Sequence, residues 1–442
     1  MPEFPYSRLR RWPDVEADNL QAHDATDLLL VERALALDAS GAETVVIGEE
    51  YGAITLPLVD SGMQGIRVHQ DLATGRRALV RNAEELGIDG FTSHELDAGL
   101  LAGARLVLLQ LPKSLAELEE IADAVARWSA PDVVLIAGGR VKHMTPTQND
   151  VLARNFAQVQ PQRAERKSRL IVVSEPREAP VDPPFPVTAR HDGLTLVAHG
   201  GAFAGARLDI GTRALLDALA LSPALRQAQG PRSAALRQAQ GPRSAALRPA
   251  QGPRSAALRP AQGPTEVGAL RPAQGPSSAA LRQAQGPTEV EAPPRVLDLG
   301  CGTGALAVLY ALAHPEAQVT ATDRSAAAVA SARATVAANG VVDRVTVTHD
   351  DAASGVADAS VDVVLLNPPF HLGSSVHTGA ATRLFEAAAR VLRPGGELFT
   401  VYNSSLGYRA QLERLIGPTA QLHRTPKFTV TRSIRRSGST DS

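Results

Sequence analysis

The sequence has one cysteine, Cys301, among 442 residues. This excludes an intrachain disulfide and a zinc site built from several cysteines, and we expect no metal. No apolar run approaches the length of about 20 residues that crosses a bilayer, and the first residues, MPEFPYSRLRRW, lack the apolar core of a secretion signal. The formal net charge is only −1, so nucleic-acid binding would depend on local basic patches. We therefore expect a cytoplasmic globular protein of two or three domains.

Residues 225–292 repeat a unit whose typical text is LRQAQGPRSAA. Each unit contains a Gly-Pro pair, through which a helix cannot continue, and its single leucine buries too little surface to offset the ordering entropy. We predict a disordered low-complexity insert. Its arginines permit loose contact with a polyanion, although a neutral expansion in a tolerant loop explains it more simply.

After the insert, apolar runs alternate with helical patterns. Ser325 is placed as the N-cap of one helix and Gly340 stands just past its end. Apolar strands separated by helices favour a parallel sheet covered on both faces, that is, a doubly wound, Rossmann-like α/β domain. The predicted strands are 295–299, 318–322, 344–348, 361–366, 397–402 and 427–434. The predicted helices are 305–313, 326–339, 384–392 and 406–416, and a turn is predicted at 393–396.

The N-terminal part shows a weaker form of the same alternation of strand and helix patterns. Strand patterns lie within residues 42–54, 104–114 and 131–139, and a helical pattern covers 114–128. The proline-rich text EPREAPVDPPFP is typical of a linker. We therefore expect two tandem α/β domains, residues 1–180 and 181–442, with the insert inside the second.

Three glycines, Gly300, Gly302 and Gly304, follow the first strand of the second domain in the text GCGTGA. They let the backbone turn tightly and approach a ligand, with a helix N-terminus behind them. Asp323, at the end of the next strand, is placed to accept hydrogen bonds from the two hydroxyls of a ribose.

Two further carboxylates narrow the choice of ligand. Asp298 precedes the glycine loop, where an acid suits a positive ammonium group, and Asp351 follows the third strand, where it can accept from an adenine amine. The glycines alone also satisfy a loose dinucleotide pattern, but S-adenosylmethionine satisfies all three carboxylates. The alternative is that these acids only cap helices and turns.

The fourth strand ends in the text NPPF. Ligands of doubly wound sheets lie at the carboxyl ends of the strands, so this tip should lie beside the methyl donor. The Asn367 side-chain oxygen and the Pro368 carbonyl can accept from one planar amine, and Phe370 offers a face for stacking a base. A proline-terminated strand with a core phenylalanine explains the stop but not the asparagine.

These motifs resemble the class I S-adenosylmethionine-dependent methyltransferases and, more narrowly, the RsmC/RlmG family of ribosomal RNA guanine-N2 methyltransferases. The segments that carry the resemblance are 192–219, 296–306, 367–371, 395–417 and 427–436. The resemblance implies two duplicated methyltransferase folds, of which only the second binds cofactor. It also places the segment LDIGT, residues 208–212, over the cofactor, with Phe203 and Asp209 lining the site.

The N-terminal copy departs from the cofactor-binding pattern. Glu50 stands where the middle glycine would be, and its charged side chain would obstruct a methionine carboxylate. The text QLPK, residues 110–113, stands roughly where NPPF would. We expect this copy to be inactive and to support the second domain or to bind RNA phosphates. The basic residues available for that, unless they form an ordinary solvated face, are Arg140, Lys142, His143, Arg163, Arg166, Lys167 and Arg169.

Together with the motifs, the resemblance implies a monomeric enzyme that transfers a methyl group from S-adenosylmethionine to guanine N2 in ribosomal RNA, with the base swung out of its stack. One alternative is another amino-group methyltransferase, acting on adenine N6 or on a protein glutamine. A second is a non-catalytic RNA-binding assembly factor, against which Asn367 and Asp323 argue. A dinucleotide-dependent oxidoreductase would lack a hydride-transfer site. Cys301 needs no nucleophilic role.

Overall fold

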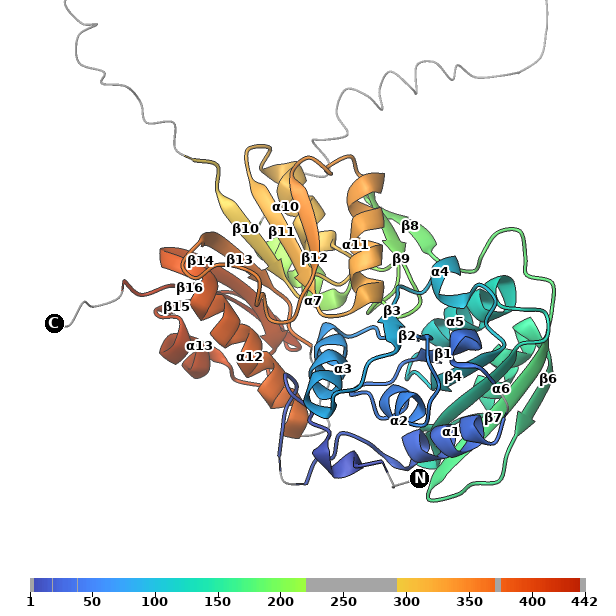
Figure 1. The fold of residues 1–442 in the computed structure, drawn as a ribbon. Coiled ribbons are helices and arrows are strands. Elements are labelled where there is room, and N and C mark those ends of the chain that lie inside the picture. Colours follow the sequence, from blue (N-terminus) through green and yellow to red (C-terminus); the bar gives the residue numbers. More distant parts are fainter. Residues whose placement is uncertain (1–3, 18, 38, 220–291, 370–374, 438–442) are drawn as a thin grey trace, which may run out of the picture. The chain divides into compact units, whose positions relative to one another are not determined.

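The structure, a computed structural model, describes residues 4–17, 19–37, 39–219, 292–369 and 375–437 (Figure 1). Phe370 and nearly all of the repeat lie outside the described residues, so the stacking role of the first and the disorder of the second stay predictions. Both α/β halves belong to one compact unit, which comprises residues 1–229 and 293–442.

The N-terminal half is built on a seven-stranded sheet in the order β3-β2-β1-β4-β5-β7-β6. Its first five strands in that order are parallel, while β7 runs antiparallel to both β5 and β6. The strands are β1 (Thr44–Ile47), β2 (Ile66–His69), β3 (Phe91–Ser93), β4 (Leu106–Gln110), β5 (Val134–Arg140), β6 (Phe156–Pro161) and β7 (Ser168–Pro176).

The C-terminal half repeats this topology in a second seven-stranded sheet, ordered β12-β11-β10-β13-β14-β16-β15. The identical strand order confirms the predicted tandem of doubly wound folds. The strands are β10 (Arg295–Leu299), β11 (Gln318–Asp323), β12 (Val345–His349), β13 (Val361–Leu366), β14 (Leu392–Asn403), β15 (Thr419–Arg424) and β16 (Phe428–Ile434).

The expectation of a wholly parallel sheet was wrong at one edge, because β16 pairs antiparallel with β14 and with β15. The predicted turn at 393–396 also lies inside strand β14. Its pairing with β13 jumps from Val361–Leu392 to Val363–Glu397, so the intervening residues bulge out without ending the strand.

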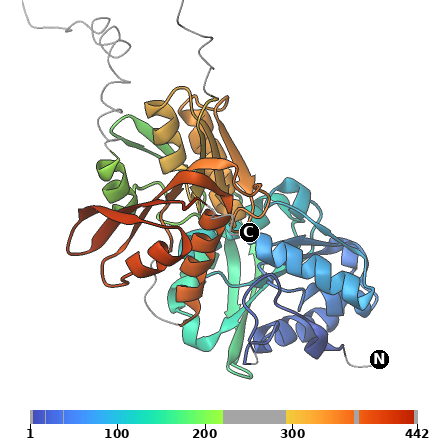
Figure 2. The same cartoon turned by 90° about the vertical axis from the view of Figure 1, so that its left-hand side faces the viewer.

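Helices cover both faces of each sheet (Figures 1 and 2). In the N-terminal half, one face carries α1 (Ala25–Leu35), α2 (Thr55–Asp60) and α3 (Ala73–Leu86), and the other carries α4 (Ala98–Leu101), α5 (Leu115–Trp128) and α6 (Pro146–Asn155). In the C-terminal half, one face carries α7 (Ile210–Ala218), α10 (Ala305–Ala313) and α11 (Ala326–Ala338), and the other carries α12 (Ser375–Val391) and α13 (Arg409–Leu415). Short 3-10 turns cover Tyr6–Arg8, Gly41–Glu43 and Val141–His143.

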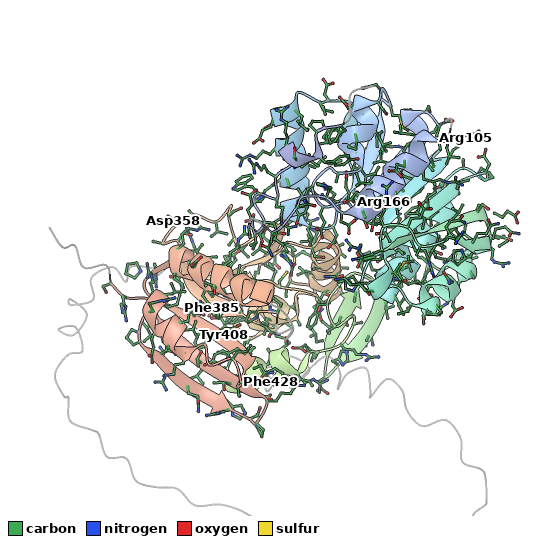
Figure 3. All side chains as sticks on the ribbon, turned by 90° about the horizontal axis from the view of Figure 1, so that it is seen from below. Arg105, Arg166, Asp358, Phe385, Tyr408 and Phe428 are labelled. Atoms are coloured by element: carbon green, nitrogen blue, oxygen red, sulfur yellow. The ribbon has the colours of Figure 1, made fainter. Side chains whose placement is uncertain are left out.

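The cores on the two faces of the C-terminal sheet are separate. Phe385 of α12 packs edge-to-face on Tyr408, with ring centroids 5.2 Å apart, whereas Phe428 lies in the core under α7 and α10 (Figure 3). A hairpin of β8 (Val187–His191) and β9 (Leu194–Ala198) lies against α11. No helix among the described residues is both long enough and apolar enough to cross a membrane.

Helix α11 begins and ends as its sequence predicts. The Ser325 hydroxyl caps it by accepting from the Ala328 N–H at 3.2 Å, and Gly340 follows its end at φ +67°. This cap fixes the chain directly after β11, where Asp323 stands.

Candidate active site

A cavity of about 610 Å³ opens at the carboxyl ends of β10, β11 and β13, large enough for a nucleoside-sized ligand. It brings together most of the predicted site residues. Those that line it are Gly300, Gly302, Asp323, Asp351, Asn367, Pro368, Phe203 and Asp209. Asp298 and Gly304 lie close by in the chain but do not line it.

The three glycines of the loop have different roles. All have positive φ, at +77° for Gly300, +53° for Gly302 and +77° for Gly304. A Cβ on Gly300 or Gly302 would meet no atom of the described residues within 4 Å, so that side of the loop faces space left open by them. A Cβ on Gly304 would lie 3.0 Å from the Cβ of Ala332. The first two glycines therefore leave room for a ligand, and the third lets α10 pack against α11.

Asp323 is held by two backbone donors. Its carboxylate accepts from the N–H of Gly302 and from the N–H of Ser325, each at 2.9 Å. Burial raises the pKa of this carboxyl, while the two backbone hydrogen bonds act in the opposite direction. The carboxylate thus has a fixed orientation at the cavity wall.

The other two predicted carboxylates differ in their surroundings. Asp298 is fully buried, and its Oδ2 accepts from the Ala307 N–H at 3.0 Å. Its Oδ1 has no hydrogen-bond partner within the described ranges. Burial raises the pKa of Asp298 to about 7. Its observed contact matches the helix-capping alternative. Asp351 lines the cavity and forms an ion pair with Arg383 of α12.

Asn367 is oriented by the segment that precedes the insert. Its Nδ2 donates to Asp209 Oδ2 at 3.1 Å and to Thr212 Oγ1 at 3.0 Å. Asp209 is itself the N-cap of α7, where it accepts from the N–H groups of Gly211 and Thr212. The donor end of the Asn367 amide is therefore occupied. Its Oδ1 is buried and has no hydrogen-bond partner among the described residues, which leaves an acceptor ready for a ligand.

Sequence reasoning missed several residues that line this cavity. Thr212, which belongs to the LDIGT segment but was not singled out, contacts Asn367, and Arg383, which belongs to no motif, contacts Asp351. The N-terminal half contributes more, since Arg11, Asp14, Tyr51 and Lys113 line the same cavity. Nothing in a single sequence shows that its two halves meet at one site.

The relatives of this chain match it almost end to end. It is 31% identical over 444 residues to a ribosomal RNA large subunit methyltransferase G of Streptomyces avermitilis, covering 97% of each chain. A protein of the same name from Pseudomonas aeruginosa is 30% identical over 440 residues, covering 97% of this chain and 99% of the relative. The chain belongs to the ribosomal RNA large subunit methyltransferase G family.

Family models cover the two halves of this family member separately. Residues 3–177 match the RLMG N-terminal domain, and residues 287–432 match the methyltransferase small domain. Among solved structures, the T. thermophilus 16S rRNA N2 methyltransferase RsmC, in complex with AdoMet and guanosine, is similar with a TM-score of 0.62 and 22% identity. The match covers 94% of this chain and 92% of that one, so the tandem fold is shared over nearly its whole length.

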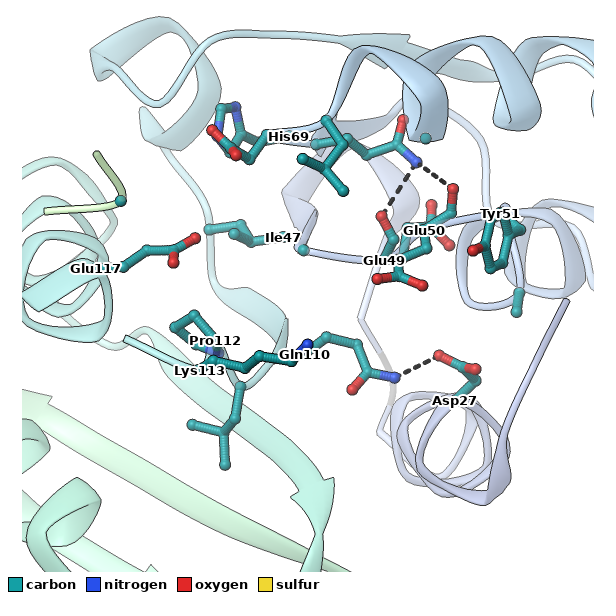
Figure 4. A pocket seen from close by; sticks show the side chains of 18 of the residues that line it. Asp27, Ile47, Glu49, Glu50, Tyr51, His69, Gln110, Pro112, Lys113 and Glu117 are labelled. Atoms are coloured by element: carbon teal, nitrogen blue, oxygen red, sulfur yellow. Dashed lines mark hydrogen bonds between the residues drawn. The ribbon is translucent and has the colours of Figure 1, made fainter. Parts of the chain in front are cut away.

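The N-terminal half of this family member keeps a cavity of about 560 Å³ at the equivalent strand ends (Figure 4). The Gly48 N–H donates to the His69 carbonyl as the Gly300 N–H donates to the Thr322 carbonyl, which sets the register between the halves. In that register Glu50 stands at the position of Gly302 and Gln70 at that of Asp323. Gln70 donates to the carbonyls of Glu49 and Glu50, so an amide donor replaces a carboxylate acceptor.

The strand tip of the N-terminal half follows the same register. Ile47 pairs with Leu109 as Leu299 pairs with Leu366, so Gln110 stands at the position of Asn367. Its Nε2 donates to Asp27 Oδ1 at 2.5 Å, and Asp27 is at the third position of α1, as Thr212 is of α7 (Figure 4). The frame of the site is thus retained, while its ligand-binding groups are replaced.

The predicted basic residues of the N-terminal half are only partly available. Arg166 (labelled in Figure 3) forms an ion pair with Glu32 at 2.6 Å. An Arg140 nitrogen lies 3.5 Å from an Asp24 carboxylate oxygen. Arg163, Arg166 and Lys167 belong to the connection between β6 and β7, where Arg166 and Lys167 have positive φ. These three side chains are exposed, as are those of Lys142 and His143.

Proposed function

We propose that this chain transfers a methyl group from S-adenosylmethionine to the exocyclic N2 amine of a guanosine in ribosomal RNA. The observation that carries the proposal is the buried Oδ1 of Asn367, which has no hydrogen-bond partner in the part of the chain that the structure describes. An amine with two hydrogens fits this oxygen together with the main-chain carbonyl of Pro368, which lines the same cavity.

The residues around the cavity fit the cofactor. Gly300 and Gly302 leave space for a ligand against the loop, and Asp323 presents a fixed carboxylate to the ribose hydroxyls. Asp351 is assigned to the adenine amine, with Arg383 holding its carboxylate. Phe203 and Asp209 line the same cavity. Asp298 does not line the cavity and has two possible contributions to cofactor binding. Its Oδ1 is available as an acceptor for the cofactor, and its Oδ2 holds the first turn of α10 by accepting from the Ala307 N–H.

The chemistry asked of the protein is positioning. S-adenosylmethionine supplies an electrophilic methyl group when bound. Asn367 and Pro368 hold both amine hydrogens, so the nitrogen lone pair is aimed along a single direction. Asp209 and Thr212 keep the amide from turning its donor end to the substrate. The amine proton leaves to water during or after transfer.

The choice of base and RNA rests on the relatives. Two acceptors suit the adenine N6 amine as well as the guanine N2 amine, so the geometry alone favours neither. The similar solved structure is named as an N2 methyltransferase and holds guanosine, and the relatives are named for the large ribosomal subunit. We therefore assign guanine N2 in large-subunit ribosomal RNA.

The two halves have separate tasks in this proposal. Residues 181–442 carry catalysis, whereas residues 1–180 support that half and contact RNA through the β6–β7 connection. Because one chain lines the cavity from both halves, no second copy is needed, and the enzyme acts as a cytoplasmic monomer.

The test uses ribosomal RNA from cells that lack the gene. The RNA is incubated with purified protein and methyl-labelled S-adenosylmethionine, the subunit RNAs are separated, and each is digested to nucleosides. We expect label in N2-methylguanosine of the large-subunit RNA, lost in Asn367→Ala. Label in N6-methyladenosine, or in protein from a parallel lysate reaction, would overturn the assignment. Cofactor binding without transfer to any fraction would favour a non-catalytic assembly factor.

A further inference from the structure

We propose that Asp71, which belongs to the half without the candidate catalytic groups, is a positioning residue for cofactor binding. It caps helix α11 of the other half and so holds Asp323 in its binding orientation. This inference rests on the proposed role of Asp323 in holding the cofactor ribose.

The contact joins two equivalent loops of the duplicated folds. The loop between β2 and α3 meets the loop between β11 and α11 through a bridge that pairs Leu72 with Ser325. The Ala73 N–H donates to the Arg324 carbonyl at 2.8 Å, and the Ala326 N–H donates to the Asp71 carbonyl at 2.8 Å. Each loop thus satisfies the first N–H of the helix that follows the other.

The Asp71 side chain adds hydrogen bonds to α11 of the C-terminal half. Its Oδ1 accepts from the Ala327 N–H at 2.9 Å and from the Ser325 hydroxyl at 3.0 Å. With its hydrogen donated in this way, the Ser325 oxygen accepts from the Ala328 N–H. A helix leaves its first four N–H groups without partners inside the helix. For α11, Asp71 satisfies two of them directly and orients the partner of a third.

Ser325 connects this cap to the candidate site. Its backbone N–H donates to Asp323 Oδ1 at 2.9 Å, one of only two hydrogen bonds found for that carboxylate among the described residues. Displacement of Ser325 would therefore release Asp323 on one side. Leu72, next to Asp71, lines the same cavity as Asp323.

General docking of the halves is a different role, and the chain offers a matched control for it. Glu120 of α5 also accepts across the halves, from the Gly200 N–H at 2.7 Å, and contacts His199. Neither Glu120 nor its partners line the cavity that contains Asp323. Asp71→Ala and Glu120→Ala thus each remove one carboxylate from the contact between the halves, but only the first touches α11.

The experiment measures cofactor affinity by calorimetry, together with KM and kcat for methyl transfer, on the full chain. Loss of an N-cap side chain predicts a rise in Kd and KM for the cofactor of about fivefold, within roughly two- to thirtyfold, in Asp71→Ala. At saturating cofactor kcat should stay near the parent value. Asp71→Asn should restore affinity, because asparagine caps helices as well as aspartate. Glu120→Ala should leave affinity unchanged.

Two results would overturn the inference: parental affinity in Asp71→Ala, or an equal loss in Glu120→Ala. Ser325→Ala removes one of the two hydrogen bonds to the Asp71 carboxylate together with the cap on the Ala328 N–H, and should also weaken binding, so it replaces Asp71→Ala if that variant does not fold. Asp323→Ala distinguishes failure of the ribose site from failure of the Asp71 inference. Unchanged cofactor affinity in Asp323→Ala would refute the proposed ribose site itself. Reduced cofactor affinity in Asp323→Ala, together with parental affinity in Asp71→Ala, would refute only the positioning role of Asp71.

Discussion

Replacing Asn367 by aspartate tests the most specific feature of the site. The change keeps the size and shape of the side chain but turns the donor that faces Asp209 into an oxygen. A carboxylate oxygen of residue 367 would then lie about 3.1 Å from Asp209 Oδ2, the length of the present hydrogen bond. Asp209 also binds the first N–H groups of α7, so it cannot turn away without uncapping that helix.

The distance sets the size of the effect. Two unit charges at this separation repel by about 5 kcal/mol at an effective dielectric of 20 and by about 1 kcal/mol in water. Both side chains are partly buried, so the penalty lies between these limits. Asn367→Asp should therefore lose roughly tenfold to several thousandfold in kcat.

The same repulsion predicts that the activity of Asn367→Asp depends on pH. Its activity should rise as the pH falls, whereas an enzyme that depends on a deprotonated base loses activity as the pH falls. A neighbouring like charge raises the pKa of one acid of the pair. Below that pKa the shared proton restores a donor toward Asp209 and leaves a carbonyl oxygen toward the substrate. The activity of Asn367→Asp relative to the parent should therefore rise as pH falls from about 8 to about 6.

A second substitution provides the rescue. In Asn367→Asp combined with Asp209→Asn, the amide at position 209 can donate to the new carboxylate and still cap α7. Methyl transfer should recover at neutral pH, measured with saturating cofactor and RNA. If the double variant is no better than the single one, or if Asp209→Asn alone is equally impaired, the orientation of Asn367 by Asp209 is not what the reaction requires.

Three further predictions follow from single contacts. Thr212→Val removes one acceptor from the Asn367 amide, so kcat in the labelled-methyl assay should fall about two- to tenfold with unchanged cofactor Kd. Burial raises the pKa of Asp27 to about 7 from an ordinary 3.8, so the folded state keeps a proton that the unfolded chain releases, and stability falls as pH rises through that window. Asp27→Asn should remove this loss, gaining up to about 4 kcal/mol relative to the parent between the two ends of the window in urea unfolding. Gly304→Ala combines a φ of +77° with a Cβ 3.0 Å from Ala332, and should cost about 1–3 kcal/mol, seen as a lower melting temperature.

Elements with a strong local pattern were predictable from the sequence. The strands and caps around α11 follow from apolar runs, Ser325 and Gly340, and the register of QLPK against NPPF agrees with the strand pairing. Strand β15 gave no such signal, because only Thr419 of its residues is buried and the rest are exposed. Its position depends on pairing with β16, which a local pattern does not encode.

The candidate site divides in the same way. Asp323, Asp351 and Asn367 were predictable as neighbours, because parallel strands bring their carboxyl ends to one edge. The contact of Asn367 with Asp209 joins residues 158 positions apart, and that of Asp71 with Ser325 joins residues 254 apart. Such contacts depend on how elements pack, and neither residue type signals its partner.

The exchange of helix caps between the two halves has a consequence for how the duplicated gene can change. A copy that has lost its own ligand is ordinarily free to drift or to be deleted. Here the β2–α3 loop of the first copy completes a helix of the second, so deletion would leave Ala326 and Ala327 without their partners. A substitution at Asp71 would then change two places at once, because Asp71 lines the cavity of the first half and also caps α11 of the second. Cavity residues that take no part in the cap, such as Gln110, do not carry this constraint.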